Sequence, residues 1–250
     1  MSSTFRRGLM MSYHNHWEPE VRTHLTNVYG CLCLTTLTAG LAAIFGLLYP
    51  ELYSQPHFFT FTHLGEIGLI VALSATHGNK ERMLLRFNIL LILAVCLGLN
   101  LIPMLKFTMI VDPAVIVTAL LSTSVVFVSF SLCSLFSERG KWLFLAAPIM
   151  SFFIFTIALM TTWLLFGIGF ALLYNCNLYL GLFATCGCVL FDTQMIMEKR
   201  RLGDDDFVTH SLNLFCNFIG IFRRLLIILT ERKIEVECTN KKKNDPDKQS

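Results

Sequence analysis

Charged residues are scarce in this chain of 250 residues: they make up 15% of the sequence, whereas 54% of the residues are hydrophobic. A soluble domain of ordinary composition carries about a quarter charged residues. The scarcity excludes a soluble globular domain and predicts an all-α polytopic membrane protein in the lipid bilayer. The net charge of +3 is small, and we expect no nucleic-acid partner.

The chain also lacks several features of secreted and metal-binding proteins. Its first residues contain no apolar core of a cleavable signal peptide, so we expect the first apolar helix to act as a signal anchor. No Asn-x-Ser/Thr sequon occurs, so glycosylation gives no indication of orientation. The nine cysteines include two Cys-x-Cys pairs, but neither pair has the second ligand pair that a zinc site needs. We interpret them as small buried hydrophobic residues and expect no cofactor.

Apolar runs divide the chain into three parts. Residues 1–24 form a polar N-terminal arm, residues 25–230 a membrane domain, and residues 231–250 a basic tail that we expect to be disordered. The expected membrane segments are 25–48, 58–76, 87–104, 113–136, 142–166, 178–201 and 207–229.

Basic residues are distributed unevenly between the two sets of loops. If the N-terminus is cytosolic, the arm and the loops after the second, fourth and sixth segments hold eleven Lys or Arg, and the opposite loops hold Lys106 alone. This distribution predicts a cytosolic N-terminus. The last segment contains Arg223 and Arg224 and precedes the basic tail. We therefore expect either a short central helix shielded by the others or a re-entrant segment that returns the tail to the cytosol.

Two acids lie within apolar segments. Asp192 lies in the second half of 178–201, which reads LYLGLFATCGCVLFDTQMIMEKRR, and Glu66 lies in 58–76. An isolated carboxylate at the centre of a membrane helix costs roughly 2.5–3.5 kcal/mol on insertion scales and is a functional hypothesis by default. The alternative is that the Asp192 side chain snorkels to water from near the helix end.

The last apolar segment carries a polar stripe that Asp192 is expected to face. At 100° per residue the stripe covers less than a quarter of the helix circumference, and it consists of His210, Asn213, Asn217, Gly220 and Arg224. These groups form either a closed network around the buried acid, which is slightly favoured, or the lining of an ion pathway. The preceding Asp204, Asp205 and Asp206 do not alternate as in a calcium loop, and we interpret them as helix capping.

Several runs of this sequence resemble the Bax inhibitor-1 (transmembrane Bax-inhibitor-motif) family: PEVRTHLTNVY, VDPAVIVTAL, LYLGLF…VLFDTQMIMEK, GDDDFVTHSLNLF and FRRLLIIL. The resemblance covers nearly all of residues 17–235 in order and spacing. It implies six transmembrane helices around a central seventh in the endoplasmic reticulum membrane. It also implies a pH-sensitive calcium leak and suppression of cell death and stress signalling.

In that family two aspartates, on the sixth and the central helix, share a proton and act as a pH gate. Asp192 matches the first, whereas the pattern Asp-Leu-Phe-x-Asp-Phe has Asn213 and Asn217 in place of both acids. Two close carboxylates form a proton switch because their charges repel, and a carboxylate beside an amide lacks this repulsion. We therefore predict a weaker or differently gated calcium passage, with Asp192 as a weak calcium contact.

Two functions agree with these observations. The first is a calcium-permeable leak in which calcium is the permeant ion and Asp192, Glu66 and the polar stripe line the pathway. The second is a non-conducting regulator that contacts Bcl-2-family proteins or membrane stress sensors. An enzyme is not expected, because a membrane hydrolase needs a His cluster for a metal or a Ser-His pair at matching depth, and the seven histidines lie mostly in arms and loops. We expect no nucleophile to serve His63 or His210. Glu66 is expected to pair with Lys106 or Arg224, or to face a lumenal vestibule.

Overall fold

The computed structural model describes residues 19–53, 55, 57–76, 82–167 and 170–244. Seven helical segments in this part of the chain are long and apolar enough to cross a membrane: Pro19–Leu48, Phe58–Ala75, Met83–Val111, Ala114–Phe136, Leu143–Phe166, Ala171–Arg201 and Phe207–Asn240. The predicted all-α multi-pass architecture is therefore confirmed.

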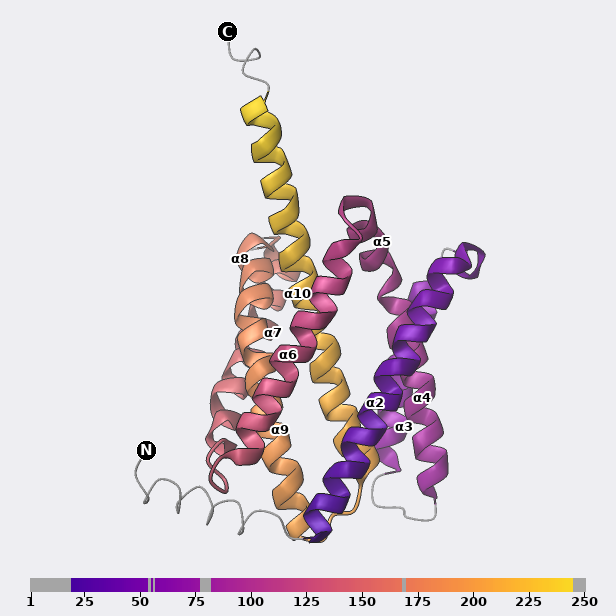
Figure 1. Ribbon diagram of the computed structural model, residues 1–250, viewed down its shortest axis with the longest axis vertical. Helices are drawn as coiled ribbons and strands as arrows, with labels where there is room; N and C mark the ends of the chain where they lie inside the picture. Colours follow the sequence, from indigo (N-terminus) through magenta and orange to yellow (C-terminus); the bar gives the residue numbers. More distant parts are fainter. Residues whose placement is uncertain (1–18, 54, 56, 77–81, 168–169, 245–250) are drawn as a thin grey trace.

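Successive helices run in opposite directions along the long axis of the molecule (Figure 1). Several crossings are built from more than one element. The elements are α2 (Pro19–Leu48), η1 (Pro50–Tyr53), α3 (Phe58–Ala75), α4 (Met83–Asn100), α5 (Ile102–Val111), α6 (Ala114–Phe136), η3 (Leu143–Leu145), α7 (Ala146–Phe166), α8 (Phe170–Asn175), η4 (Cys176–Leu180), α9 (Gly181–Arg201) and α10 (Phe207–Asn244).

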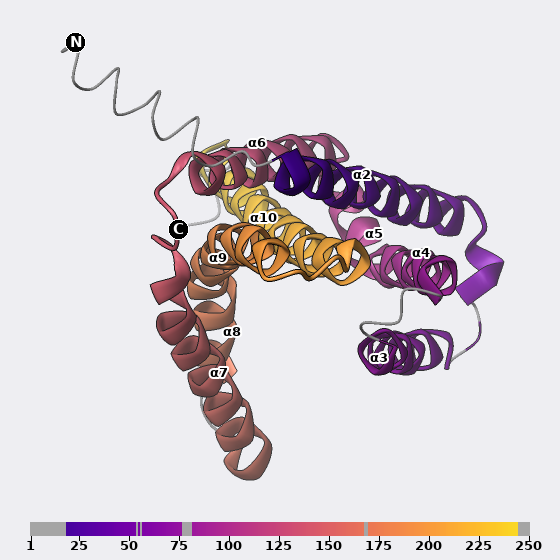
Figure 2. The same ribbon diagram turned by 90° about the horizontal axis from the view of Figure 1, so that it is seen from below.

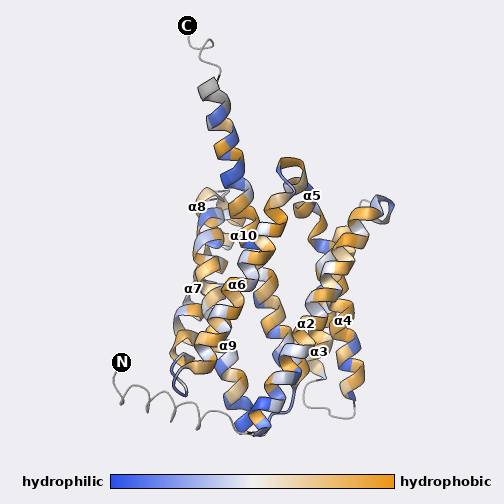
Figure 3. Cartoon of the chain, in the orientation of Figure 1, coloured by the Kyte–Doolittle hydropathy of each residue, from blue (hydrophilic) through white to orange (hydrophobic). Residues whose placement is uncertain are grey.

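Helix α10 is the centre of the bundle. Helices α2, α6 and α9 pack directly on it, α4 and α5 reach it from one side, and α3 and α7 lie farther out, against α4 and α9 (Figure 2). The fully buried Leu214, Phe215, Ile221 and Leu226 of α10 form the core with residues from these neighbours. The outer helices are apolar on their exposed faces (Figure 3), as expected for surfaces that contact lipid tails rather than water.

Glycines in the left-handed conformation follow two of the helices. Gly167 follows α7 with φ of 66°, and Gly203 follows α9 with φ of 94°. A left-handed backbone at this position satisfies the last helical carbonyls, and glycine adopts it without a Cβ clash. Gly203 therefore places the Asp204–Asp206 segment at the turn into α10.

Helices α2 and α4 approach each other more closely than side chains allow. A Cβ atom placed on Gly98 would lie 2.2 Å from the backbone oxygen of Ala39. Small residues permit such backbone contacts between membrane helices, where packing replaces the hydrophobic effect as the driving force. This contact fixes α4 against α2 and thereby positions the start of α4 beside α10.

The structure decides between the two expectations for the last segment. Helix α10 crosses the whole bundle, and its last described residues lie beyond the opposite end of the bundle from Pro19 (Figure 1). The re-entrant alternative is therefore wrong, and the central helix is long (38 residues) rather than short. The expected disordered tail is also wrong for residues 231–244, which continue α10, while residues 245–250 lie outside the described part. Extending an existing helix costs little compared with starting one, and Lys233 ties the extension to Asp112 at 2.8 Å.

Three other boundaries differ from expectation. The third crossing runs from Met83 to Val111 rather than over 87–104, because Pro103 lies in the first turn of α5 and does not end the crossing. Helix α2 begins at Pro19 rather than after residue 24, because proline is favoured in the first helical turn, where its missing N–H is not needed. The sixth crossing begins with α8 and the π-helical turn η4, so it is not a continuous α-helix from residue 178. Residues 1–18 of the expected arm lie outside the described residues.

Candidate functional site between α9 and α10

Asp192 of α9 and Asn217 of α10 meet between the two adjoining helices. The Asn217 Nδ2 amide donates a hydrogen bond to Asp192 Oδ2 at 2.6 Å. Both side chains are half-buried. The structure thus brings together the two positions that the family resemblance pairs, and the hydrogen bond satisfies the carboxylate without neutralising its charge.

Gln194 explains why Asp192 points toward α10. Its buried amide accepts a hydrogen bond from the Trp142 backbone N–H at 2.7 Å and donates one to the Glu138 carbonyl at 3.0 Å. Two residues on a helix are about 200° apart, so fixing Gln194 against the loop after α6 turns Asp192 to the other side. The Asp-Thr-Gln sequence therefore sets the rotation of α9.

Arg224 does not approach Asp192 as a partner. Its Nε donates to the backbone oxygen of Asn177 at 3.1 Å, its Nη2 to Asn177 Oδ1 at 3.3 Å, and its Nη1 to the Gly220 carbonyl at 3.1 Å. A Cβ on Gly181 would lie 2.6 Å from Arg224 Nε. Arg224 therefore fills the space between η4 and α10, two turns beyond Asn217, and belongs to a different site.

His210 and Asn213 of the predicted stripe also lie apart from Asp192. His210 is 1% exposed and its Nδ1 lies 2.9 Å from His24 Nε2 of α2, so one ring donates a hydrogen bond to the other. Asn213 is exposed. Of the stripe, only Asn217 bonds to Asp192 among the described residues.

Glu66 of α3 lies in an outer polar cluster. Its Oε1 accepts a hydrogen bond from Asn100 of α4, 2.5 Å away, and its Oε2 lies 3.2 Å from His63 Nδ1. Thr62 adds a hydrogen bond to Asn100 at 2.6 Å. The expected pairing with Lys106 or Arg224 is wrong: Lys106 lies over the Tyr53 ring, 4.5 Å from its centroid, and Arg224 bonds to Asn177.

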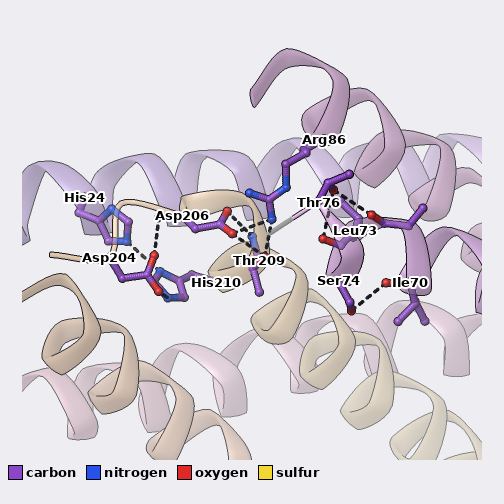
Figure 4. Close-up of polar contacts among 11 residues, drawn as sticks. His24, Ile70, Leu73, Ser74, Thr76, Arg86, Asp204, Asp206, Thr209 and His210 are labelled. Atoms are coloured by element: carbon purple, nitrogen blue, oxygen red, sulfur yellow. Dashed lines mark hydrogen bonds and ion pairs between the residues drawn. The ribbon is translucent and has the colours of Figure 1, made fainter. Parts of the chain in front are cut away.

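Arg86, Asp206 and Thr209 form a buried cluster that the sequence did not assign. Arg86 Nη2 lies 2.6 Å from Asp206 Oδ2 and 2.7 Å from the Thr209 hydroxyl (Figure 4), and the two charged side chains are 1% and 5% exposed. Asp206 also accepts the Thr209 backbone N–H at 3.2 Å. The predicted capping of α10 by this acidic run is thus confirmed for Asp206, but the same carboxylate also binds α4. The sequence feature that could have revealed this cluster is Arg86 itself, an arginine within the apolar first turns of α4.

These hydrogen-bond donors stabilise the ionised form of the Asp206 carboxylate. Burial raises the pKa of this carboxyl, but the hydrogen bond from Arg86, those from Thr209 and the Arg86 charge outweigh it, and the net pKa is lowered. Asp206 is therefore ionised at neutral pH. Beside it, His210 Nε2 lies 3.7 Å from Asp204 Oδ2, so a histidine–carboxylate contact lies next to the arginine–carboxylate pair at the same end of the bundle (Figure 4).

No group of three or more His, Cys, Asp or Glu side chains that could hold a metal ion occurs in the described residues. The hydrogen-bond partner of the Asp192 carboxylate among the described residues is the Asn217 amide rather than a second acid. Hard cations prefer several oxygen ligands, and the predicted weak calcium contact of Asp192 stays a prediction.

Known proteins match this chain over most of its length. A model of the family described as "Inhibitor of apoptosis-promoting Bax1" matches residues 21–233. The chain is 38% identical over 210 residues to "Probable Bax inhibitor 1" of Paralichthys olivaceus, which covers 83% of this chain and 85% of that protein. It is 34% identical over 218 residues to mouse (Mus musculus) "Bax inhibitor 1", covering 86% and 88% of the two chains. It is 34% identical over 235 residues to "Bax inhibitor 1" of Drosophila melanogaster, covering 92% and 89%.

Proposed function

Because the chain belongs to the Bax inhibitor 1 family, we propose that it regulates cell death and calcium homeostasis in the endoplasmic reticulum membrane. In this proposal it acts as a weak, pH-influenced calcium leak through the contact between α9 and α10. The observation that carries the proposal is the 2.6 Å hydrogen bond between Asn217 and Asp192 at the centre of the bundle.

The amide at residue 217 is the reason to expect a weak leak. Two facing carboxylates repel each other when both lose their protons, and this repulsion can separate their helices. The Asn217 amide instead donates to ionised Asp192, so deprotonation strengthens the contact between α9 and α10. The site also carries one formal negative charge where two carboxylates would attract a hard cation more strongly.

Calcium flux in proteoliposomes tests the proposal. Wild-type protein, Asp192→Asn and Asn217→Asp are reconstituted at equal density, and calcium release is measured at pH 6 and pH 8. We expect Asn217→Asp to raise the flux several-fold and to make it depend more on pH, because it restores carboxylate repulsion. Asp192→Asn should lower the flux toward that of empty liposomes.

Asn213→Asp is the matched control, since it adds the same charge one turn away at an exposed position. It should leave the flux near that of the wild type. A wild-type flux equal to that of empty liposomes, or an Asn217→Asp flux equal to that of Asn213→Asp, would contradict the leak.

The extension of α10 favours a second function, in which the protein acts without conducting. Residues 235–240 are exposed and extend beyond the bundle (Figure 1). They are accessible to membrane stress sensors if α10 ends in the lumen, and to Bcl-2-family proteins only if it ends in the cytosol. If Asp192→Asn protects cells from death as well as the wild type does, and removal of residues 235–250 abolishes protection, contact rather than conduction is the mechanism.

The proposal also includes the orientation of the chain. We place the N-terminus in the cytosol because the Lys and Arg residues are concentrated in the loops on that side. Seven crossings then place the end of α10 in the lumen. Epitope tags at the two ends, probed in cells whose plasma membrane alone is permeabilised, should label only at the N-terminus. Labelling at both ends would refute the seven-crossing arrangement in cells.

A further inference from the structure

A small cationic cavity lies between η4 and α10, on the side of the bundle where α10 leaves it. Its volume is about 220 Å³, and its polar lining consists of Tyr174, Asn177, Gly220, Arg223 and Arg224. Two features make the space: the π-helical turn η4 bulges the backbone, and Gly181 and Gly220 leave room for the Arg224 guanidinium. The cavity is separate from the Asp192–Asn217 contact.

The positive charge of this cavity is not balanced by acids among the described residues. Arg224 is half-buried, and its three hydrogen bonds all go to neutral oxygens of Asn177 and Gly220. A guanidinium has five N–H donors, so two remain for a ligand. Arg223 is exposed, and neither arginine forms an ion pair within the part of the chain that the structure describes. The nearby Glu231 carboxylate accepts the hydrogen bond of the Tyr174 hydroxyl.

The cavity lies toward the end of the apolar part of α10. Arg223 follows the first residue of α10 by sixteen positions, which is about 24 Å along the helix axis. The hydrocarbon core of a bilayer is about 30 Å thick, so a helix that begins near one surface brings Arg223 near the other. Tyrosine is enriched at membrane–water interfaces, and arginine side chains recognise phosphate through paired, charge-assisted hydrogen bonds.

We propose that the cavity formed by Tyr174, Asn177, Arg223 and Arg224 binds a phosphate group. The two arginines supply fork-shaped, charge-assisted donors that match phosphate oxygens, and an unpaired, half-buried guanidinium gains most from such a partner. The group comes from an anionic phospholipid or from a soluble phosphate, and the two sources share the same contacts. This inference does not depend on calcium passage.

Binding to the full-length protein in detergent tests the proposal. Native mass spectrometry measures retention of phosphatidic acid and of phosphatidylcholine with the same acyl chains, and a parallel titration uses inorganic phosphate. We expect phosphatidic acid to bind at least about tenfold more tightly than phosphatidylcholine, which corresponds to about 1.4 kcal/mol. Arg223→Gln and Arg224→Gln should each remove most of this preference, and Arg224→Lys should retain part of it.

Arg232→Gln is the matched control, because Arg232 is exposed on the same helix outside the cavity. If Arg224→Gln fails to fold, Arg223→Gln remains decisive, since its side chain is exposed. Arginine-dependent binding of inorganic phosphate without lipid preference would support the site and assign the soluble source. Equal binding by wild type and Arg223→Gln, equal loss with Arg232→Gln, or no binding of either probe would overturn the proposal.

Discussion

Replacing Asp206 by Asn tests whether the buried ion pair holds α4 against α10. The Arg86 and Asp206 side chains are 1% and 5% exposed and 2.6 Å apart. Asn has nearly the same shape and can still cap α10, but it leaves the Arg86 charge buried without a counter-charge. Removing one partner of a buried pair costs about 3–5 kcal/mol. Asp206→Asn should therefore lower the free energy of unfolding by that amount, measured by denaturation of the purified protein in mixed micelles.

The double variant Arg86→Met/Asp206→Asn distinguishes the loss of the ion pair from the cost of leaving Arg86 charged and unpaired. Replacing both charges with groups of similar volume is often nearly neutral, so the double variant should recover at least half of the lost stability. Thr209→Val removes only the hydroxyl bonded to Arg86 at 2.7 Å and should cost about 1.5–3 kcal/mol, as expected for a hydrogen bond to a charged group. An Asp206→Asn variant within about 1 kcal/mol of the wild type would refute this reasoning.

The Arg86–Asp206 ion pair also predicts how the free energy of unfolding depends on pH. The pKa of Asp206 is lower in the folded protein than its ordinary value of 3.8. Its contribution is therefore complete above that ordinary value and is lost as the pH falls toward the folded-state pKa. The stability difference between wild type and Asp206→Asn should be constant from pH 7 to about pH 5 and shrink below about pH 4. A difference that stays constant through pH 3 would contradict the assignment.

Two further predictions concern contacts between α2 and its neighbours. Gly98→Ala should destabilise the protein by about 1–3 kcal/mol or more, because its Cβ would lie 2.2 Å from the Ala39 oxygen. Gly30→Ala is the control, because its Cβ would lie in open space on α2, and it should be neutral or stabilising by up to about 1 kcal/mol. If Gly98→Ala and Gly30→Ala change the free energy of unfolding equally, the close contact between α2 and α4 is refuted. His24→Ala should cost about 1–3 kcal/mol, since it leaves the buried His210 Nδ1 without its partner, and an unchanged unfolding midpoint would show that this pair contributes nothing.

Much of the secondary structure follows from neighbours close in the chain. Apolar runs fix the crossings because each must match the thickness of the bilayer. Gly167 and Gly203 end helices through their own backbone conformations, and Asp206 caps α10 through the N–H three residues later. The proximity of Asp192 and residue 217 was also predictable, because the polar stripe had to face a neighbouring helix and the family pattern paired the two positions.

The contact partners of the remaining site residues depend on how each helix is rotated about its axis and on which helices pack together. His210, Asn217 and Arg224 share one stripe of α10, yet a long helix passes several partners along its length, so they contact His24, Asp192 and Asn177 respectively. Glu66 meets Asn100 because α3 packs on α4, which hydropathy does not specify.

The sequence by itself determined that this protein crosses the membrane repeatedly, and its polar stripe predicted that Asp192 faces the last helix. These properties are set by local composition and by residue identity. Only the tertiary structure decided that α10 passes through the whole bundle, that Arg86 neutralises Asp206 across 120 residues of sequence, and that Arg224 lines a separate cavity. The reason is physical: a buried charge is stable only beside a suitable partner, and its partner is fixed by the packing of distant helices rather than by the residues around it.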